Sequence, residues 1–321
     1  MGSPNATIKE MPMTTQSEQL IKDIEDMKVK GAYLITKVAL EALGMRAGEL
    51  AARGEQLAPA LRAAGARLAA SQPSMACVAN GCVYVLGALA DDLPAAEAQA
   101  ALAERSQAFL AAFDQAQSRA LDVGARLIRD GETIFIHSYT GTLLETFRRA
   151  LALGKQFRII ATESRPYCEG RFMVSELLKL GIPCTIVTDA SIGSFIGRAD
   201  KSLVGCDSIL VNGNVVNKMG TFLLALACRE RGVPLYASGN IFKLSMASLR
   251  GDEVRMLRRG DDGTIPIAPQ GLPADAPLTV ENTIFDETPA HLFAGLITDQ
   301  GVLPPPAIAE FRTHPMLAAE V

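Results

Sequence analysis

The segment from residue 207 to 221 contains residue types that could bind an anion and react with the molecule that carries it. It reads Asp-Ser-Ile-Leu-Val-Asn-Gly-Asn-Val-Val-Asn-Lys-Met-Gly-Thr and ends where an apolar helical pattern begins. The first N–H groups of a helix lack partners within the helix and carry positive potential, and Lys218 adds a full charge. We predict that Asn217 and Lys218 bind a phosphate or carboxylate there, with Asp207 placed to do chemistry. The alternative is a capped helix whose lysine is only solvated.

Further polar clusters follow the β-rich runs of the second half of the chain, at residues 137–141, 163–166 and 188–189. In an open parallel sheet, ligands bind beyond the carboxyl ends of the strands, so these clusters should meet at one edge. Arg165 precedes a proline and is therefore held out of helical geometry, so its side chain either reaches a cleft or lies on the surface. We expect His137 to have a structural role, with its ring bonded to the backbone.

Two kinds of pattern divide the chain. Residues 18–130 are rich in Ala, Leu, Glu and Arg, with apolar residues three and four positions apart, which predicts a helical domain. Short β-rich runs at 133–137, 157–161, 184–187 and 235–238 then alternate with amphipathic helical patterns, which predicts an α/β domain with a parallel sheet. Residues 207–211 could be a further strand. Residues 251–277 predict a long loop that either folds over a site or only connects.

Composition excludes several classes of function. The chain has 321 residues, a net charge of −4 and a pI near 5.6, which gives no electrostatic reason to expect direct nucleic-acid binding. Its six cysteines and three histidines show neither zinc spacing nor a disulfide framework, so we expect a cytoplasmic protein without a metal. The uncharged stretch 68–90 is interrupted by polar residues, so we predict a buried helix and no membrane span.

Several motifs of this chain occur, in the same order, in one known family. The chain resembles the family that joins the eukaryotic translation initiation factor 2B alpha, beta and delta subunits with the sugar 1-phosphate isomerases. The motifs of the second half are Ile136-His137-Ser138-Tyr139, Thr162-Glu163-Ser164-Arg165-Pro166, Gly181-Ile182-Pro183-Cys184-Thr185-Ile186-Val187-Thr188-Asp189, Gly205-Cys206-Asp207, Asn212-Gly213 and Asn217-Lys218-Met219-Gly220-Thr221. Looser matches lie at 27–32, 71–74, 285–289 and 297–302.

The resemblance implies a helical N-terminal domain on a Rossmann-like C-terminal domain, with dimers built mainly through the latter. We therefore expect a flexible segment at residues 1–17, a helical domain at 18–130, and a Rossmann-like α/β domain at 131–321 that carries most of the site. A homodimer or a higher homo-oligomer is the expected assembly. The family's isomerases act on methylthioribose 1-phosphate and ribose 1,5-bisphosphate, a chemistry that requires no metal or redox cofactor.

The resemblance also assigns the reacting groups. In the isomerases these are a cysteine in a His-Cys-Asn turn and an aspartate in a Gly-Ala-Asp-Arg turn, whose positions here hold Ser138 and Asp207. An aldose 1-phosphate opens only if its ring oxygen is protonated, and hydrogen must then move between C1 and C2 with a positioned acid and base. Asp207 is the expected acid and base. Ser138 is expected to orient the sugar or to relay a proton, because an unassisted serine does not replace a thiol.

The anion side of the site departs from the family pattern at three positions. Lys30 and Gln72 replace the family's arginines, and Ser208 replaces the arginine beside the catalytic aspartate. Losing a bidentate guanidinium weakens phosphate binding. The residues expected to hold phosphate are Lys30, Gly31, Gln72, Arg165, Asn217 and Lys218.

Two functions follow from these observations. The first is an isomerase that converts an aldose 1-phosphate or related phosphosugar into its ketose, with Asp207 as general acid and base. The alternative is a catalytically inactive regulatory protein resembling the initiation factor 2B alpha subunit, which binds a sugar phosphate or nucleotide and acts through subunit assembly. The His-Ser-Tyr turn at 137–139 resembles this second branch. The sequence leaves open which sugar phosphate is bound and whether turnover survives Ser138.

Overall fold

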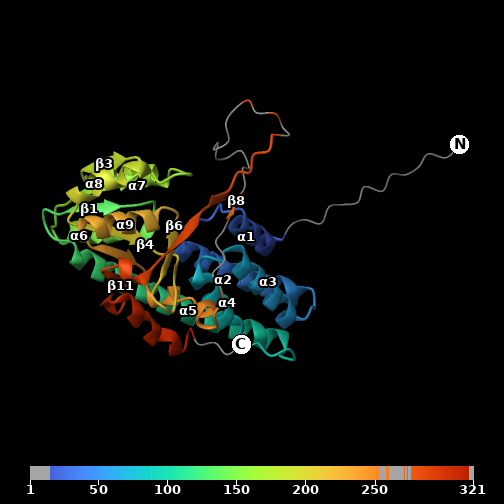
Figure 1. Ribbon diagram of the computed structural model, residues 1–321. Coiled ribbons are helices and arrows are strands. Elements are labelled where there is room, and N and C mark those ends of the chain that lie inside the picture. Colours follow the sequence, from blue (N-terminus) through green and yellow to red (C-terminus); the bar gives the residue numbers. More distant parts are fainter. Residues whose placement is uncertain are drawn as a thin grey trace.

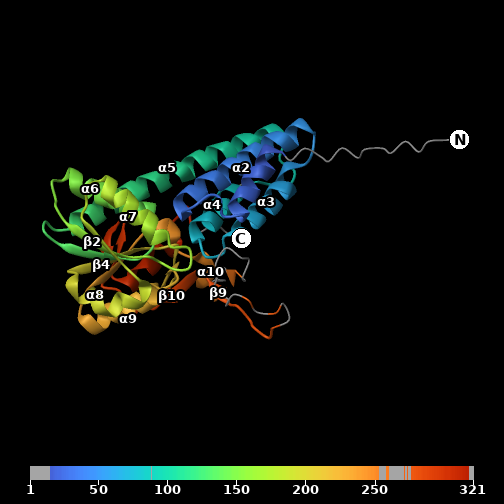
Figure 2. The same ribbon diagram turned by 90° about the horizontal axis from the view of Figure 1, so that it is seen from above.

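The computed structural model describes residues 15–87, 89–252, 258–259, 271, 273 and 276–317, and it begins with a group of packed helices (Figure 1). Alanine- and leucine-rich segments with apolar residues at helical spacing form these helices and bury one face of each. The longest, α5, runs from the helical group to the sheet and contacts both (Figure 2). The helices of this part are α1 (Gln16–Glu25), α2 (Ala32–Ala52), α3 (Leu57–Ser71), α4 (Ala76–Leu86) and α5 (Ala95–Leu127).

The second part is built on a seven-stranded sheet in the order β12-β11-β7-β4-β1-β2-β3. All neighbouring strands are parallel except the edge pair β11 and β12. The strands are β1 (Thr133–Ile136), β2 (Arg158–Thr162), β3 (Cys184–Val187), β4 (Lys201–Gly205), β7 (Leu235–Ser238), β11 (Gly295–Thr298) and β12 (Gly301–Leu303). The predicted fold class, helices followed by a parallel-sheet α/β unit, is confirmed.

Helices cover both faces of this sheet. α6 (Gly141–Ala152) and α7 (Glu169–Lys179) lie on one face, and α8 (Ile192–Phe195) and α9 (Thr221–Arg231) lie on the other (Figure 2). Strands buried on both sides need continuous apolar runs, and Ile134, Phe135 and Ile136 of β1 are fully buried. After β3 the chain returns to place β4 on the other side of β1, so the connections from β1 and β4 diverge. This divergence is the topological switch point at which such sheets bind ligands.

A smaller antiparallel sheet lies beside the main one and contains β5 (Ser208–Ile209), β6 (Val215–Lys218) and β10 (Phe285–Thr288). Asn217 and Lys218 therefore end a strand and do not open a helix, which corrects the prediction for this segment; α9 begins at Thr221. The proposed strand at 207–211 is present only as the two residues of β5. The remaining elements are α10 (Met246–Leu249), β8 (Arg258–Arg259), β9 (Asn282–Thr283), η1 (Asp189–Ser191), η2 (Ile196–Arg198), η3 (Ile241–Lys243), η4 (Ala290–Leu292) and η5 (Pro305–Thr313).

Three other expectations concern single segments. α1 begins at Gln16, inside the segment expected to be flexible, and the buried Ser17 donates from its N and Oγ to Glu49 at 3.0 and 2.6 Å. Residues 1–14 and most of the predicted loop 251–277 lie outside the described residues. The uncharged stretch 68–90 forms the end of α3, a turn and α4, and no helix among the described residues is long and apolar enough to cross a membrane.

Candidate active site

Ser138 stands just beyond the carboxyl end of β1, at the switch point. It is 5% exposed and has a left-handed backbone, with φ of 69°. Its backbone N–H donates to Ser164 Oγ at 2.6 Å. Its own Oγ is buried without a hydrogen-bond partner among the described residues. A buried hydroxyl normally has a partner, so this oxygen is available to a ligand.

Asp207 lies two residues beyond the end of β4, the strand next to β1. Its backbone N–H donates to Val216 O at 2.9 Å, which ties it to β6. The side chain is half-buried, and no group in the described part of the chain hydrogen-bonds its carboxylate. Burial raises the pKa of Asp207, the positive charges of Lys243 and Lys218 oppose this shift, and the charge of Glu169 adds to it. A carboxyl group whose pKa is raised keeps its proton to higher pH than an ordinary aspartate does.

Lys218 points its ammonium group at α7. Its Nζ lies 2.9 Å from Glu169 Oε1, and the side chain is 12% exposed. The rings of Tyr167 and Phe285 lie 5.8 and 5.1 Å from the same ammonium. The other oxygen of Glu169, Oε2, is buried and has no partner among the residues described. Lys218 is therefore a partly buried, paired cation and not the solvated helix-start lysine of the alternative interpretation.

The start of α9 already holds an anionic group of the protein itself. Gly220 N and Phe222 N donate to Asp286 Oδ2 at 2.7 and 3.2 Å. Burial raises the pKa of Asp286 to about 6, and its hydrogen bonds from these backbone groups oppose that shift. The prediction that free N–H groups at this helix start bind the ligand's anion is therefore wrong for these two amides. Asn217 also bonds internally, because its Nδ2 donates to Thr221 Oγ1 at 2.9 Å.

Arg165 lies beyond the end of β2 and is exposed, with a cis peptide bond to Pro166. Its backbone N–H donates to Asp189 Oδ2 at 2.6 Å, and Ser164 N donates to Asp189 Oδ1 at 2.9 Å. Its guanidinium Nη1 is 3.8 Å from Cys168 Sγ and makes no ion pair in the part of the chain that is described. The guanidinium is therefore exposed, which fits both of the positions that the sequence left open, in a cleft or on the surface.

His137 has the predicted structural role. It is 1% exposed, its Nε2 lies 2.7 Å from Met219 O, and its Nδ1 lies 2.7 Å from Thr162 Oγ1. Because a carbonyl only accepts, Nε2 carries the proton and Nδ1 accepts from the threonine hydroxyl. Burial lowers the pKa of His137, which keeps the ring neutral.

The helical part contributes the remaining predicted residues. Lys30 is exposed and places its Nζ 5.9 Å from the ring of Phe172, one turn along α7 from Glu169. Gly31 directly precedes α2 and has φ of 87°, a backbone that favours glycine. Gln72 is buried, and its Nε2 donates to Ile24 O at 3.0 Å.

Ser208 explains one departure from the family pattern. It is buried, accepts from Ala76 N at 2.8 Å and donates to Ser74 O at 2.8 Å. The hydroxyl of this buried serine links β5 to the segment that leads into α4. The nearby end of β4 therefore lacks the additional guanidinium.

Lys243 is a site residue that the sequence did not reveal. It is buried at 4% exposure, its Nζ donates to Cys206 O, and its charge acts on Asp207. Burial raises the pKa of Cys206 to about 12, so this thiol does not replace the missing cysteine nucleophile. A single lysine between the apolar residues Phe242 and Leu244 was the available signal, since a charge buried in such a run needs partners.

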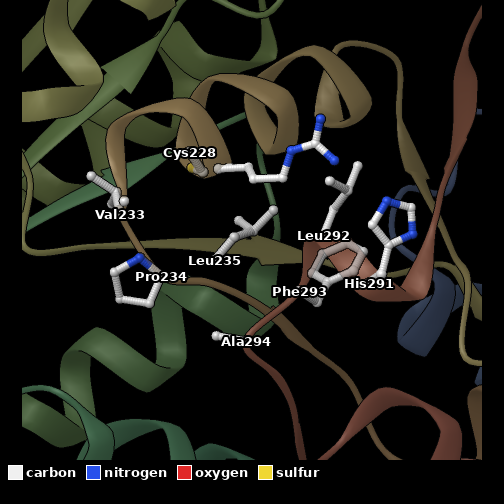
Figure 3. A pocket seen from close by; sticks show the side chains of 10 residues that line it. Cys228, Val233, Pro234, Leu235, His291, Leu292, Phe293 and Ala294 are labelled. Atoms are coloured by element: carbon white, nitrogen blue, oxygen red, sulfur yellow. The ribbon is translucent and has the colours of Figure 1, made fainter.

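Figure 3 shows a surface hollow that lies away from these residues. It has a volume of about 270 Å³ and is lined by the end of α9 and by residues 232–235 and 291–294. These segments precede β7 and β11, so the hollow lies at the amino ends of the strands. Among the described residues, no group of three or more His, Cys, Asp or Glu side chains could hold a metal ion.

Comparison with known proteins settles the family. A sequence profile of the Initiation factor 2 subunit family matches residues 28–305. The chain belongs to this family. A ribose 1,5-bisphosphate isomerase of Haloterrigena turkmenica is 33% identical over 293 residues, covering 89% of each chain. A translation initiation factor eIF-2B subunit 2-like protein of Pyrococcus horikoshii is 33% identical over 288 residues, covering 90% of this chain and 96% of that protein. The crystal structure of the Pyrococcus horikoshii OT3 translation initiation factor eIF-2B is 31% identical, covers 92% of this chain and 98% of its own, and has a TM-score of 0.77.

Proposed function

We propose that this protein is a phosphosugar isomerase that converts an aldose 1-phosphate into a ketose phosphate. One observation carries the proposal: Ser138 Oγ and the Asp207 carboxylate lie beyond neighbouring strands at the switch point, and both lack a hydrogen-bond partner in the described chain. These are the two positions at which the family's isomerases place their reacting groups. Unpartnered polar groups at such a place are arranged for a ligand.

Asp207 performs the proton transfers in this proposal. Opening the sugar ring breaks the bond between C1 and the ring oxygen, and the ring oxygen receives a proton. The hydrogen on C2 then moves to C1 with its bonding electron pair, and the C2 hydroxyl gives up its proton as the ketone forms. The raised pKa of Asp207 supports the donor step, and its ionised form accepts a proton afterwards. Ser138 Oγ bonds a sugar hydroxyl and orients it.

The phosphate is held by cations from both parts of the protein. Lys218 and Lys30 contact the same face of α7, through Glu169 and Phe172, and Arg165 stands at the neighbouring strand end. Gly31 follows Lys30 directly, whereas the amide groups of Gln72 and Asn217, the other residues predicted for the phosphate, donate to Ile24 O and Thr221 Oγ1. We further propose that the protein works in the cytoplasm as a homodimer or higher homo-oligomer.

A second function is favoured by a different observation. Ser138 carries a hydroxyl at the position where the family's isomerases carry a thiol. In addition, an isomerase and an initiation-factor-like protein match this chain at the same 33% identity. In this alternative the same residues bind a sugar phosphate or nucleotide without turnover, and binding controls subunit assembly.

Turnover assays separate the two functions. We would incubate the purified protein with ribose 1-phosphate, methylthioribose 1-phosphate and ribose 1,5-bisphosphate, and follow ketose formation. Asp207→Asn should lower kcat by about 10²–10⁴-fold, the usual contribution of a general acid or base. Asp200→Asn is the matched control, because Asp200 bonds Thr133 N at the opposite edge of the sheet.

Each outcome favours one function. A ketose product that is lost in Asp207→Asn and kept in Asp200→Asn establishes the isomerase. If no substrate gives an Asp207-dependent product, while phosphosugars or nucleoside monophosphates still raise the melting temperature, the binding function replaces it.

A further inference from the structure

One hydrogen-bond network joins the carboxyl ends of β1, β2 and β3. Asp189, which begins η1 after β3, accepts from Ser164 N at 2.9 Å and from Arg165 N at 2.6 Å. Ser164 Oγ in turn accepts from Ser138 N at 2.6 Å. The ends of these three strands are therefore connected through the Asp189 carboxylate and the Ser164 hydroxyl. The backbone N–H groups that donate to them are those of Ser138, Ser164 and Arg165.

The network holds two serines in an unfavourable backbone conformation. Ser138 and Ser164 both have left-handed backbones, with φ of 69° and 61°. Residues other than glycine adopt this region only when the surrounding structure compensates the cost. The hydrogen bond between Ser138 N and Ser164 Oγ links the two, and Asp189 fixes the second of them. Ser138 therefore takes its orientation from a residue two strands away.

The side chains of Thr162 and His137 belong to the same hydrogen-bond network. Thr162 Oγ1 lies 2.7 Å from His137 Nδ1 and 3.0 Å from Ser164 Oγ. Thr162 and Ser164 are fully buried. The one atom of this cluster left without a partner is Ser138 Oγ, as far as the described residues extend. The hydrogen bonds of the other atoms hold the backbone of Ser138 and Ser164 in place.

We propose that Asp189 is a positioning residue, which sets the Ser138 hydroxyl and the Arg165 backbone for the phosphosugar without touching it. This inference rests on the proposed function. The carboxylate is needed because its two oxygens accept from two adjacent N–H groups. An asparagine offers one carbonyl oxygen and one NH₂ group, so one of the two backbone donors would face another donor.

The test compares two carboxylates of the same kind. Asp189 and Asp200 both accept from backbone N–H groups, Asp189 at the carboxyl ends of the strands and Asp200 at their amino ends. We expect Asp189→Asn to lower kcat for ketose formation at least about tenfold, with a smaller change in KM, and Asp200→Asn to leave both unchanged. Both variants should lose a few degrees of melting temperature. An Asp189→Asn enzyme with wild-type kcat and a lowered melting temperature would overturn the proposal.

A double-mutant cycle asks whether Asp189 acts through Ser138. If it does, Asp189→Asn costs little further kcat in a Ser138→Ala background, whereas independent residues give additive losses. Additive losses contradict the positioning role. If the wild-type protein binds ribose 1,5-bisphosphate without turning it over, the isomerase proposal fails, and the same cycle is measured by calorimetry on the dissociation constant. Coupling in affinity then supports the inference, and additivity again overturns it.

Discussion

Charged side chains from three separate segments shift the pKa of the Asp207 carboxyl. Lys243 follows β7, Lys218 ends β6 and Glu169 begins α7, and all three act on the pKa of the Asp207 carboxyl. Burial and Glu169 raise that pKa, while the two lysines lower it. The pKa of this half-buried carboxyl is therefore set by charges on three segments as well as by burial.

Removing the charge of Lys243 should change the pKa of Asp207 in a predictable direction. Lys243→Met keeps the volume of the side chain but removes its charge, so the pKa of Asp207 should rise further. The limb of the pH profile of kcat/KM that reports Asp207 should therefore move to higher pH. Measuring kcat/KM from pH 5 to 9 tests this. A profile that does not move, or that moves to lower pH, contradicts the assignment of Lys243 to the site.

The positions of single residues could be predicted from the sequence where those residues belong to a motif. Ser138, Asp207 and Arg165 stand at strand ends as predicted, because apolar runs fix the strands and the next polar residue then falls at the edge. The prediction missed Lys243 and Asp286, since their partners Cys206 and Gly220 come from distant segments. Spacing along the chain carries no information about such contacts.

The start of α9 is stabilised by a side chain of another element, β10. Asp286 of β10 lies opposite Asn217 in the antiparallel pair and accepts from Gly220 N and Phe222 N. A carboxylate at a helix start is favourable, but burial here raises its pKa to about 6. The strand therefore holds the helix in place at the cost of desolvating the carboxylate.

Because burial raises the pKa of Asp286, the free energy of unfolding of the protein depends on pH. The folded-state pKa of Asp286 is about 6, above the ordinary value of 3.8, so the folded protein binds more protons than the unfolded chain between these values. The contribution to the free energy of unfolding is then lost as the pH rises through 6. Relative to Asp286→Asn, the wild-type protein should lose about 1 kcal/mol between pH 5 and pH 7.

Urea unfolding at the two pH values measures this difference. Glu287→Gln serves as the control, because it removes a carboxylate from the same strand without touching the start of α9. If the gap between wild type and Asp286→Asn stays constant with pH, the carboxylate does not titrate in the folded protein as described.

At the scale of elements, prediction succeeded for apolar strands and failed for polar ones. The predicted strands at 184–187 and 235–238 agree with β3 and β7, because each is an apolar run of strand length between turn residues. β6 was missed because Asn217, Lys218 and Gly220 resemble a helix start. Its strand conformation depends on pairing with β5 and β10, which lie apart in sequence.

The whole molecule depends on how the helical part packs on the sheet. The aromatic rings of Phe109 and Phe113 in α5 lie 5.2 and 5.6 Å from the ring of Phe242, in edge contacts. Asn80 of α4 donates through Nδ2 to Phe242 O at 2.8 Å and to Leu244 O at 2.9 Å. The segment that carries Lys243 is therefore held by helices, so the helical part supports the site as well as the core.

This arrangement predicts that a change in α4 weakens both stability and ligand binding. Asn80→Ala leaves two buried carbonyls without their donor and should cost about 2–4 kcal/mol of unfolding free energy. Because Lys243 lies between these carbonyls, affinity for ribose 1,5-bisphosphate should fall as well. Gln99→Ala is the control, since Gln99 bonds Ala47 O within the helical part only and should cost about 1 kcal/mol or less without changing affinity. Urea unfolding and calorimetry measure the two effects, and an Asn80→Ala protein that binds as tightly as wild type would show that the site does not depend on the helices.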